Sequence, residues 1–102
     1  MAHRILFRLR AKDDLFSLYR YIAEQSGIDR ASGFVDRIEA ACSALRHFPE
    51  RGTRRDDLGD GIRTIGFERR ATIIFRVRAD VVEILMIAYA GREFEAGWGD
   101  QG

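Results

Sequence analysis

Apolar and polar positions alternate at the start of the chain and then change to helical spacing. Within residues 3–9, Ile5, Phe7 and Leu9 occupy every second position, which predicts a first strand. A helix over 12–25 is predicted next by apolar residues three and four positions apart: Leu15, Leu18, Tyr19 and Ile22.

The flanks of this first helix agree with that interpretation. Asp13 and Asp14 fall where the positive end of a helix dipole favours acidic side chains. Gly27 follows the last apolar position and suits a left-handed C-terminal cap.

A second helix is predicted by the longest periodic stripe in the sequence. Asp29 is a good N-cap, and Pro49, the only proline, limits the helix at its other end. Between them, apolar residues follow i, i+3, i+4, i+7 spacing: Ala31, Phe34, Val35, Ile38, Ala41, Cys42 and Leu45. The link between the helices is short, so we expect an antiparallel helix hairpin.

The second half of the chain has the pattern of strands. Residues 49–61 are polar and glycine-rich, which predicts a loop. Three strand-like segments follow over residues 62–67, 71–78 and 81–89, separated by links short enough for hairpins. The last is apolar on both faces except at Glu83, which predicts a central strand. The order β-α-α-β-β-β indicates an α+β fold with the helix hairpin packed against an antiparallel sheet.

Length and composition indicate one domain. The 102 residues suffice for a single core, and the apolar fraction of 46% is ordinary for a globular protein. We expect residues 1–102 to form this domain, with 91–102 a short, loosely held tail that Phe94 and Trp98 could anchor. No signal peptide or transmembrane run is apparent, so a cytoplasmic location is expected.

Charge is small in total but uneven along the chain. The net charge is +1, and sixteen of the seventeen basic residues are arginines. Residues 51–78 carry eight basic and four acidic side chains, whereas residues 79–102 carry one basic and five acidic. The middle of the chain therefore predicts a local basic surface.

Residue types that support catalysis are poorly placed for it. His3 and His47 lie far apart without other ligands at metal-binding spacing, so no metal and no cofactor are predicted. Cys42 lies within an apolar helical stripe and suggests a packed, unreactive thiol. The carboxylate pairs suit a helix start and a solvated loop, so no catalytic residues are assigned.

The arginines of the last strands have two interpretations. Those on or between the strands are Arg63, Arg69, Arg70, Arg76 and Arg78, with Arg92 after the last strand. If Arg63 and Arg76 share a sheet surface near Tyr89 and Trp98, they could contact phosphates and stack on bases. The alternative is that these arginines pair with Asp56, Asp57, Asp60 and Glu68 and keep the sheet soluble.

Three groups of residues together resemble a known family. They are 11–15 with Tyr19-Arg20-Tyr21-Ile22; 48–52 leading to Asp57-Leu58 and Gly61-Ile62-Arg63; and 74–77 followed by 82–85 and 89–92. Their joint spacing over residues 3–95 resembles the RelE/ParE superfamily of type II toxin–antitoxin systems, and the Phe-Pro-x-x-Gly loop and Gly-x-Arg opening are similar to its ParE branch. The resemblance implies a toxin that poisons DNA gyrase, alone or with bound DNA, and blocks replication.

The RNA-cleaving RelE branch is the alternative. Its basic positions on the second strand correspond to Arg63 and Ile65, an arginine of the next strand to Thr72, and its final Arg and Tyr to Arg92 and Trp98. Cutting RNA requires a base, a proton donor and cations on the phosphate, so the missing groups favour the non-catalytic gyrase inhibitor. A ribosome-dependent mRNA endonuclease using Arg63, Arg92 and Tyr89 stays open, as does a relic with neither activity.

The resemblance also implies partner residues. A ParD-like antitoxin would form a hetero-oligomer with the toxin over exposed apolar and basic side chains, for which the expected residues are Phe16, Tyr19, Arg20, Leu45, Phe48 and Leu58. The residues expected to contact the target are Arg63, Arg76, Tyr89, Arg92 and Trp98. For Phe16 and Tyr21, a place beside the core or in a homodimer is the alternative.

Overall fold

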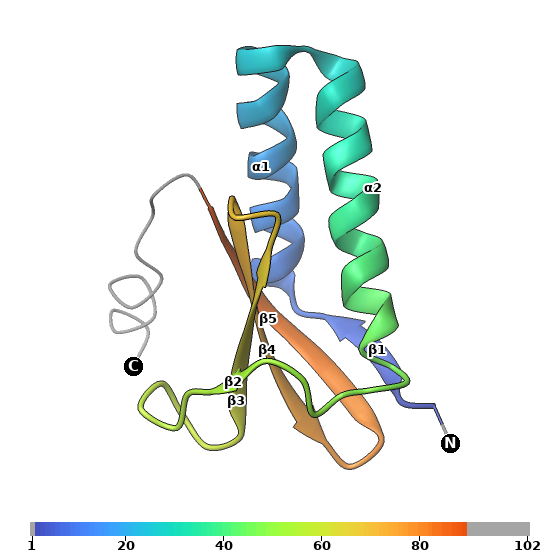
Figure 1. Ribbon diagram of the computed structural model, residues 1–102, viewed down its shortest axis with the longest axis vertical. Coiled ribbons are helices and arrows are strands. Elements are labelled where there is room, and N and C mark those ends of the chain that lie inside the picture. The colour runs from blue at the N-terminus through green and yellow to red at the C-terminus, as the bar shows by residue number, and fades with distance from the viewer. Residues whose placement is uncertain (1, 90–102) are drawn as a thin grey trace.

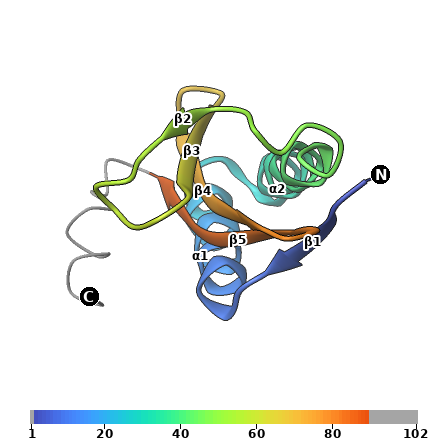
Figure 2. The same cartoon turned by 90° about the horizontal axis from the view of Figure 1, so that it is seen from below.

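The computed structural model describes residues 2–89 of the chain. Its elements, in order, are β1 (Arg4–Phe7), α1 (Leu9–Ser26), α2 (Ile28–Ala44), β2 (Thr53–Arg54), β3 (Ile62–Phe67), β4 (Ala71–Arg78) and β5 (Val81–Tyr89). The two helices run side by side and pack against a twisted five-stranded sheet (Figures 1 and 2). The predicted order of strands and helices is confirmed, with β2 added. Neither helix in residues 2–89 has the length and apolar character needed to cross a membrane.

The first helix begins three residues earlier than predicted. Arg8 alone separates β1 from α1: its N–H still donates to Ile84 of β5 (3.0 Å), while its carbonyl accepts the first helical bond from Lys12 (3.1 Å). Strand pairing therefore passes directly into the helix. As a result Asp13 and Asp14 lie beyond the first turn, and their predicted role at the helix start is wrong.

A single glycine joins the helices. Gly27 is the C-cap of α1 and the N-cap of α2, with φ at +98°, a region that residues with a Cβ rarely adopt. Asp29 lies in the first turn of α2 and is not its N-cap, so that prediction is wrong in position. The predicted apolar stripe is confirmed by the buried residues of α2: Ala31, Phe34, Ile38 and Cys42.

The sheet is mixed, which corrects the predicted antiparallel sheet. Its strand order is β1-β5-β4-β3-β2. β1 pairs in parallel with β5, whereas the other neighbours are antiparallel. Parallel pairing follows because the chain passes through both helices and three strands before β5 returns beside β1. The prediction that the last strand is central is confirmed: it has neighbours on both sides, and residues 82–89 are all buried.

A β-bulge changes which residues of β5 face the helices. Ile74 of β4 pairs with Met86 and the next residue, Phe75, pairs with Ile84, so Leu85 is the extra residue. Ile84 and Ile87 consequently both belong to the main core, which we call the helix-side core. Its buried residues come from both helices and the sheet, and include Leu15, Leu18, Phe34, Ile38, Ile73, Phe75 and Tyr89. The opposite face of the sheet carries a smaller cluster, against which Leu58 packs: Ile62, Ile74, Leu85, Met86 and Ala88.

The polar loop over 49–61 contains a short edge strand that the sequence pattern did not predict. Thr53 and Arg54 pair with Thr64 and Arg63 of β3. Gly52 precedes them at φ +78°, and a Cβ there would collide with the Thr64 carbonyl. Close backbone approach at Gly52 is therefore what allows this edge to form.

Candidate interaction surfaces

The arginines of the sheet do not form one surface. Arg63 pairs across the strands with Phe75 of the helix-side core, whereas Arg76 pairs with Ile62 of the opposite cluster. Side chains paired across strands share a face, so Arg63 and Arg76 lie on opposite faces of the sheet. The expectation that they reach the same sheet surface is wrong, because they differ by an odd number of positions in the paired register.

Arg76 is engaged within the protein. Its guanidinium donates to Glu83 Oε1 from Nε (3.2 Å) and Nη2 (3.1 Å), and Arg8 Nη1 lies 3.6 Å from Glu83 Oε2. Glu83 is buried, so two cations neutralise the only acidic group of β5. A target could reach Arg76 only in competition with this ion pair.

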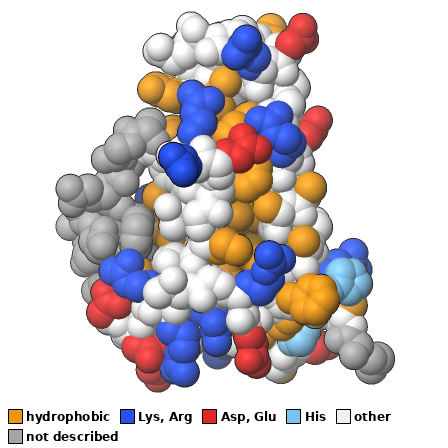
Figure 3. All heavy atoms as spheres, viewed as in Figure 1, with side chains coloured by type: hydrophobic (Ala, Val, Ile, Leu, Met, Phe, Trp, Pro, Cys, Tyr) orange, Lys and Arg blue, Asp and Glu red, His pale blue; other side chains and the backbone are white. Residues whose placement is uncertain are grey.

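The other sheet arginines are differently placed. Asp56 and Asp57 pair with Arg54 and Arg55 at 3.2 and 2.8 Å, and Glu68 pairs with Arg37, so the predicted pairing of these carboxylates with the arginines of the later strands is wrong. The Arg55 hydrogen bond also lowers the pKa of Asp57 below its usual value. Within residues 2–89, no carboxylate pairs with the remaining arginines of the predicted set: Arg63, Arg69, Arg70 and Arg78. Figure 3 shows both signs of charge interspersed on one face of the molecule.

The other residues expected to contact the target are buried or beyond the described range. Tyr89 is 5% exposed and belongs to the helix-side core, with its ring centroid 6.0 Å from that of Tyr21. Arg92 and Trp98 lie outside the described residues, as does Phe94. Their part in target binding stays a prediction.

The expected antitoxin-binding residues fall into exposed and buried groups. Phe16 is 63% exposed on α1, one turn from Arg20, whose guanidinium carbon lies 5.9 Å from the ring centroid. Phe48, after α2, is 68% exposed. Tyr19 packs partly against the core, and Leu58 against the smaller cluster.

The expectation that Leu45 contacts the antitoxin is wrong. It is 1% exposed and belongs to the helix-side core. The helical stripe that predicted the core already included Leu45, so the same side chain cannot also add surface for a partner.

Asp14 is a structural residue that the sequence analysis did not identify. It is 6% exposed; its Oδ2 accepts the N–H of Ile87 (2.9 Å), and its Oδ1 accepts Nε of Arg10 (3.1 Å). β1 covers β5 only as far as Ile84, so the Ile87 N–H has no strand partner on that side. Asp14 supplies the missing acceptor from α1. Its position on the inward face, between Ala11 and Leu18, was the available signal.

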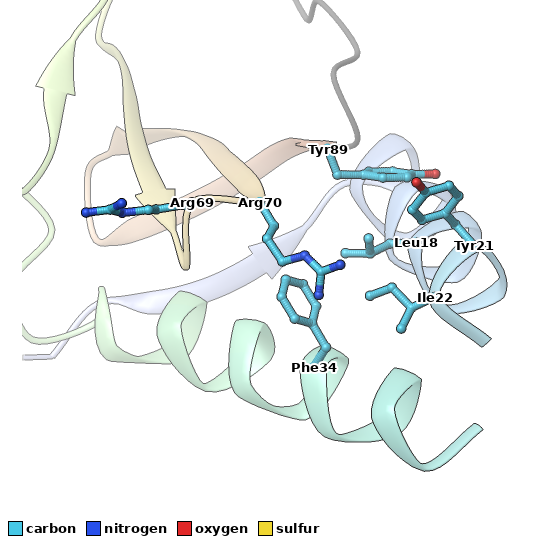
Figure 4. A pocket seen from close by; sticks show the side chains of 7 residues that line it. All are labelled: Leu18, Tyr21, Ile22, Phe34, Arg69, Arg70 and Tyr89. Atoms are coloured by element: carbon cyan, nitrogen blue, oxygen red, sulfur yellow. The ribbon is translucent and has the colours of Figure 1, made fainter. Parts of the chain in front are cut away.

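A cavity of about 260 Å³ opens where both helices meet the end of the sheet. Leu18, Tyr21 and Ile22 of α1 line it together with Phe34 of α2, Tyr89 of β5, and Arg69 and Arg70 of the β3–β4 turn (Figure 4). A second pocket of about 430 Å³ adjoins it and shares three lining residues: Ile22, Phe34 and Arg70. We refer to the two pockets together as the interhelix groove.

The turn beside the groove is anchored to α2. Glu68 and Arg69 both have positive φ, at 51° and 59°, as tight hairpin turns require. Arg37 of α2 donates to both Glu68 carboxylate oxygens at 2.8 and 3.0 Å. This bidentate pair lowers the pKa of Glu68 and raises that of Arg37.

The ring of Phe34 lies close to the guanidinium groups of Arg37 and Arg70. Its ring packs edge-on against Phe67, with centroids 5.4 Å apart, and the guanidinium carbons of Arg37 and Arg70 lie 5.6 and 5.8 Å from its centroid. Arg69 and Arg70 were noted in the sequence as strand-linking arginines, but their meeting with Phe34 depends on the packing of α2 against the turn.

The one cysteine has a buried thiol that is expected to be unreactive. Cys42 is fully buried in the helix-side core, and burial raises the pKa of its thiol to about 12. The prediction that it packs as a small hydrophobe is confirmed. Within the described part of the chain, no three His, Cys, Asp or Glu side chains gather as metal ligands do.

Solved structures of other proteins have the same architecture. The chromosomal ParDE toxin–antitoxin system from P. aeruginosa matches with a TM-score of 0.76 at 24% identity, over 87% of this chain and 97% of that chain. The RelBE2 toxin–antitoxin complex from Mycobacterium tuberculosis matches with a TM-score of 0.62 at 19% identity, over 90% and 95%. These similarities show that the fold is shared with proteins of toxin–antitoxin systems.

Sequence comparison then gives the family. Residues 5–94 match the family model for the ParE toxin of the type II toxin–antitoxin system parDE. The chain is also 31% identical over 84 residues to toxin ParE3 of Caulobacter vibrioides, covering 82% of this chain and 83% of that protein. It therefore belongs to the ParE toxin family, and the resemblance stated from the sequence motifs is confirmed.

Proposed function

We propose that this ParE-family toxin stops growth by binding DNA gyrase, alone or with bound DNA, and that a ParD-like antitoxin holds it inactive in a hetero-oligomer. The observation that carries the proposal is the family match over residues 5–94. Gyrase and its DNA are cytoplasmic, so the proposal includes a cytoplasmic location.

The placement of side chains supports an inhibitor rather than a nuclease. Ile65, at one of the nuclease-branch basic positions, packs partly against the core, and Thr72 occupies another. Arg63, at the other of these positions on β3, donates to the Arg51 carbonyl at 3.5 Å. A cation alone provides neither the base nor the proton donor that RNA cleavage needs.

Exposed apolar side chains support the proposal that an antitoxin binds this protein. Phe16 and Phe48 are among the largest exposed apolar groups within residues 2–89. A partner helix that orders on binding could cover the Phe16–Arg20 surface of α1. Phe16, Tyr19, Arg20, Phe48 and Leu58 are the residues we retain for this contact.

The test is a gyrase supercoiling and DNA-cleavage assay with antitoxin-free toxin. We expect loss of supercoiling or accumulation of cleaved DNA. Adding antitoxin before the toxin meets gyrase should prevent both effects. Arg63→Glu should weaken the effect at least tenfold, whereas the same change at Arg46, an exposed arginine after α2 and away from the sheet arginines, should weaken it less.

A translating extract provides the second readout. Intact mRNA together with blocked gyrase supports the proposal. Untouched gyrase with cleaved mRNA would replace it by the endonuclease, and no effect on either would leave a binding relic.

A further inference from the structure

The face of the sheet turned away from the helices carries a group of arginines. Alternate residues of β1 and β4 pack against the helix-side core: Ile5, Phe7, Ala71, Ile73, Phe75 and Val77. Because successive residues of a strand point to opposite faces, Arg4 of β1 and both Arg76 and Arg78 of β4 point away from that core. An arginine of the first strand thus shares a face with two arginines of a later strand.

Strand register brings these side chains together on three neighbouring strands, β1, β5 and β4 (Figure 1). Val81 of β5 pairs with Arg4 on one side and with Arg78 on the other. Neighbouring strands lie about 4.8 Å apart, so the Cα atoms of Arg4 and Arg78 are roughly 10 Å apart. The two guanidinium groups can therefore contact the same ligand.

The buried carboxylate of Glu83 lies in the next row of the sheet and neutralises part of this charge. Glu83 pairs across the strands with Arg76, which donates to its Oε1, and Nη1 of Arg8 lies 3.6 Å from its Oε2. The Arg8 side chain is 56% exposed and stays accessible to a ligand. We call the four basic side chains the outer arginine cluster: Arg4, Arg8, Arg76 and Arg78.

Two members of the cluster have no acidic partner in the described part of the chain. Arg4 and Arg78 are exposed, and no carboxylate of residues 2–89 lies within ion-pair distance of either. Two exposed carboxylates belong to the turns at this end of the sheet. They are Asp80, whose backbone carbonyl accepts the Arg4 N–H at 2.8 Å, and Asp60, two residues before β3. Both reduce the local positive potential, but they leave the two guanidinium groups available to an anionic ligand.

The side chains between these arginines favour a phosphate backbone over exposed bases. The register places aliphatic residues there: Leu6, which is 46% exposed, and Val81. Proteins bind single-stranded nucleic acid largely by stacking its bases on aromatic rings. A duplex keeps its bases stacked inside and presents phosphates, to which guanidinium groups donate charge-assisted hydrogen bonds. The cluster therefore suits the backbone of a duplex.

We propose that the outer arginine cluster binds the phosphate backbone of duplex DNA through Arg4, Arg8 and Arg78, while Arg76 stays paired with Glu83. The choice of DNA rests on the proposed function, because gyrase acts on DNA. Phosphate contacts do not read bases directly, so binding should be independent of DNA sequence. The toxin would then contact the DNA as well as the enzyme bound to it.

The salt dependence of DNA binding tests these contacts. The full chain, free of antitoxin, is titrated into a labelled DNA duplex of mixed sequence, and fluorescence anisotropy gives the binding constant at several salt concentrations. Three phosphate contacts predict that the logarithm of the binding constant falls against that of salt concentration with a slope of about −2.7. A slope close to zero, or no binding even at low salt, would overturn the proposal.

Single substitutions test which arginines are used. Arg4→Gln and Arg78→Gln should each weaken binding about fivefold at low salt and make the slope shallower by about 0.9. Arg30→Gln is the matched control, because it removes the same charge from an exposed position in the first turn of α2. It should leave the slope unchanged. Urea unfolding checks that all three variants fold, and equal weakening by all three would reduce the effect to net charge and overturn the proposal.

Other probes separate the cluster's ligand from alternatives. Equal or tighter binding of duplex RNA or of single-stranded DNA would overturn the assignment to duplex DNA. The anisotropy assay contains no gyrase, so DNA binding by a toxin that leaves gyrase untouched would refute the proposed function alone. Gyrase inhibition that Arg78→Gln weakens, by a toxin that does not bind DNA, would assign the cluster to a protein contact and overturn this proposal alone.

Discussion

Asp14 has a polar side chain and Cys42 packs as an apolar one, but each lies on the inward side of its helix. The Asp14 carboxylate is useful there because it meets a backbone N–H of β5 that no strand covers. The Cys42 thiol is tolerated because it stays neutral and packs as an apolar group. Single buried groups such as these depend on the neighbours that tertiary packing provides.

Removing the Asp14 carboxylate should destabilise the protein. Asp14→Ala leaves the Ile87 N–H buried without an acceptor, so we expect the free energy of unfolding to fall by about 2–3 kcal/mol. Asp13→Ala, at the exposed neighbouring position, should change it by less than about 0.5 kcal/mol. Urea denaturation measures both, and equal stability of the two variants would contradict the role assigned to Asp14.

Cys42 should resist thiol reagents in the folded protein. Its raised pKa keeps the thiol protonated, and burial blocks access, so labelling at pH 8 should be slow until denaturant is added. The unfolded thiol ionises at lower pH than the folded one. Stability is therefore fully present below the ordinary thiol pKa and decreases as pH rises toward about 12. As the control, a Ser43→Cys, Cys42→Ala variant places the thiol on the exposed neighbour and should label rapidly.

At the scale of elements, the hairpins depend on unusual backbone angles. Ala79 lies in the two-residue link between β4 and β5 at φ +53°, and Glu68 and Arg69 share this region in the preceding turn. Their sequences lack the usual Asn-Gly or Asp-Gly signal. Strand pairing on both sides therefore imposes the turn conformation on ordinary residues.

Glycine should improve one of these turns. Ala79→Gly removes a Cβ that disfavours positive φ, and we expect the free energy of unfolding to rise by about 0.5–1 kcal/mol. The same change at Ala40, exposed within α2, should lower it by about 1 kcal/mol, because glycine disfavours helices. Thermal or urea unfolding compares them, and destabilisation by both changes would argue against strain at Ala79.

At the scale of the whole molecule, binding surfaces are what packing leaves exposed. Phe16 stays outside the core although it lies on the same helix as Leu15 and Leu18. Leu45, which the sequence analysis also assigned to the antitoxin contact, is buried in the helix-side core. The candidate antitoxin contact therefore includes fewer residues than the sequence analysis predicted.

Phe16→Ala should weaken antitoxin binding by at least about tenfold, or ~1.4 kcal/mol, while leaving unfolding unchanged. The reason is that an exposed aromatic ring contributes contact area to a partner but little to the fold. Leu9→Ala, at another exposed apolar position of α1 outside the predicted contact, is the control and should bind normally. Calorimetric titration with the antitoxin measures both affinities, and equal losses would indicate general surface sensitivity instead.

The sequence by itself determined the elements and the family. Period-two and helical spacing identify both helices and four of the five strands, because apolar periodicity reports which face of an element is buried. The joint motifs of residues 3–95 indicated the ParE branch that the family match confirms. The edge strand β2 escaped detection because two polar residues carry no periodicity.

Only the tertiary structure decided which side chains meet. The register of β3 on β4 separates Arg63 from Arg76, and the bulge at Leu85 decides which residues of β5 face the helices. The end of β1 at Phe7 leaves the N–H that Asp14 accepts, and packing of α2 beside the β3–β4 turn assembles Phe34 and Arg70 into a groove. Each of these depends on contacts between residues far apart along the chain, which local periodicity does not encode.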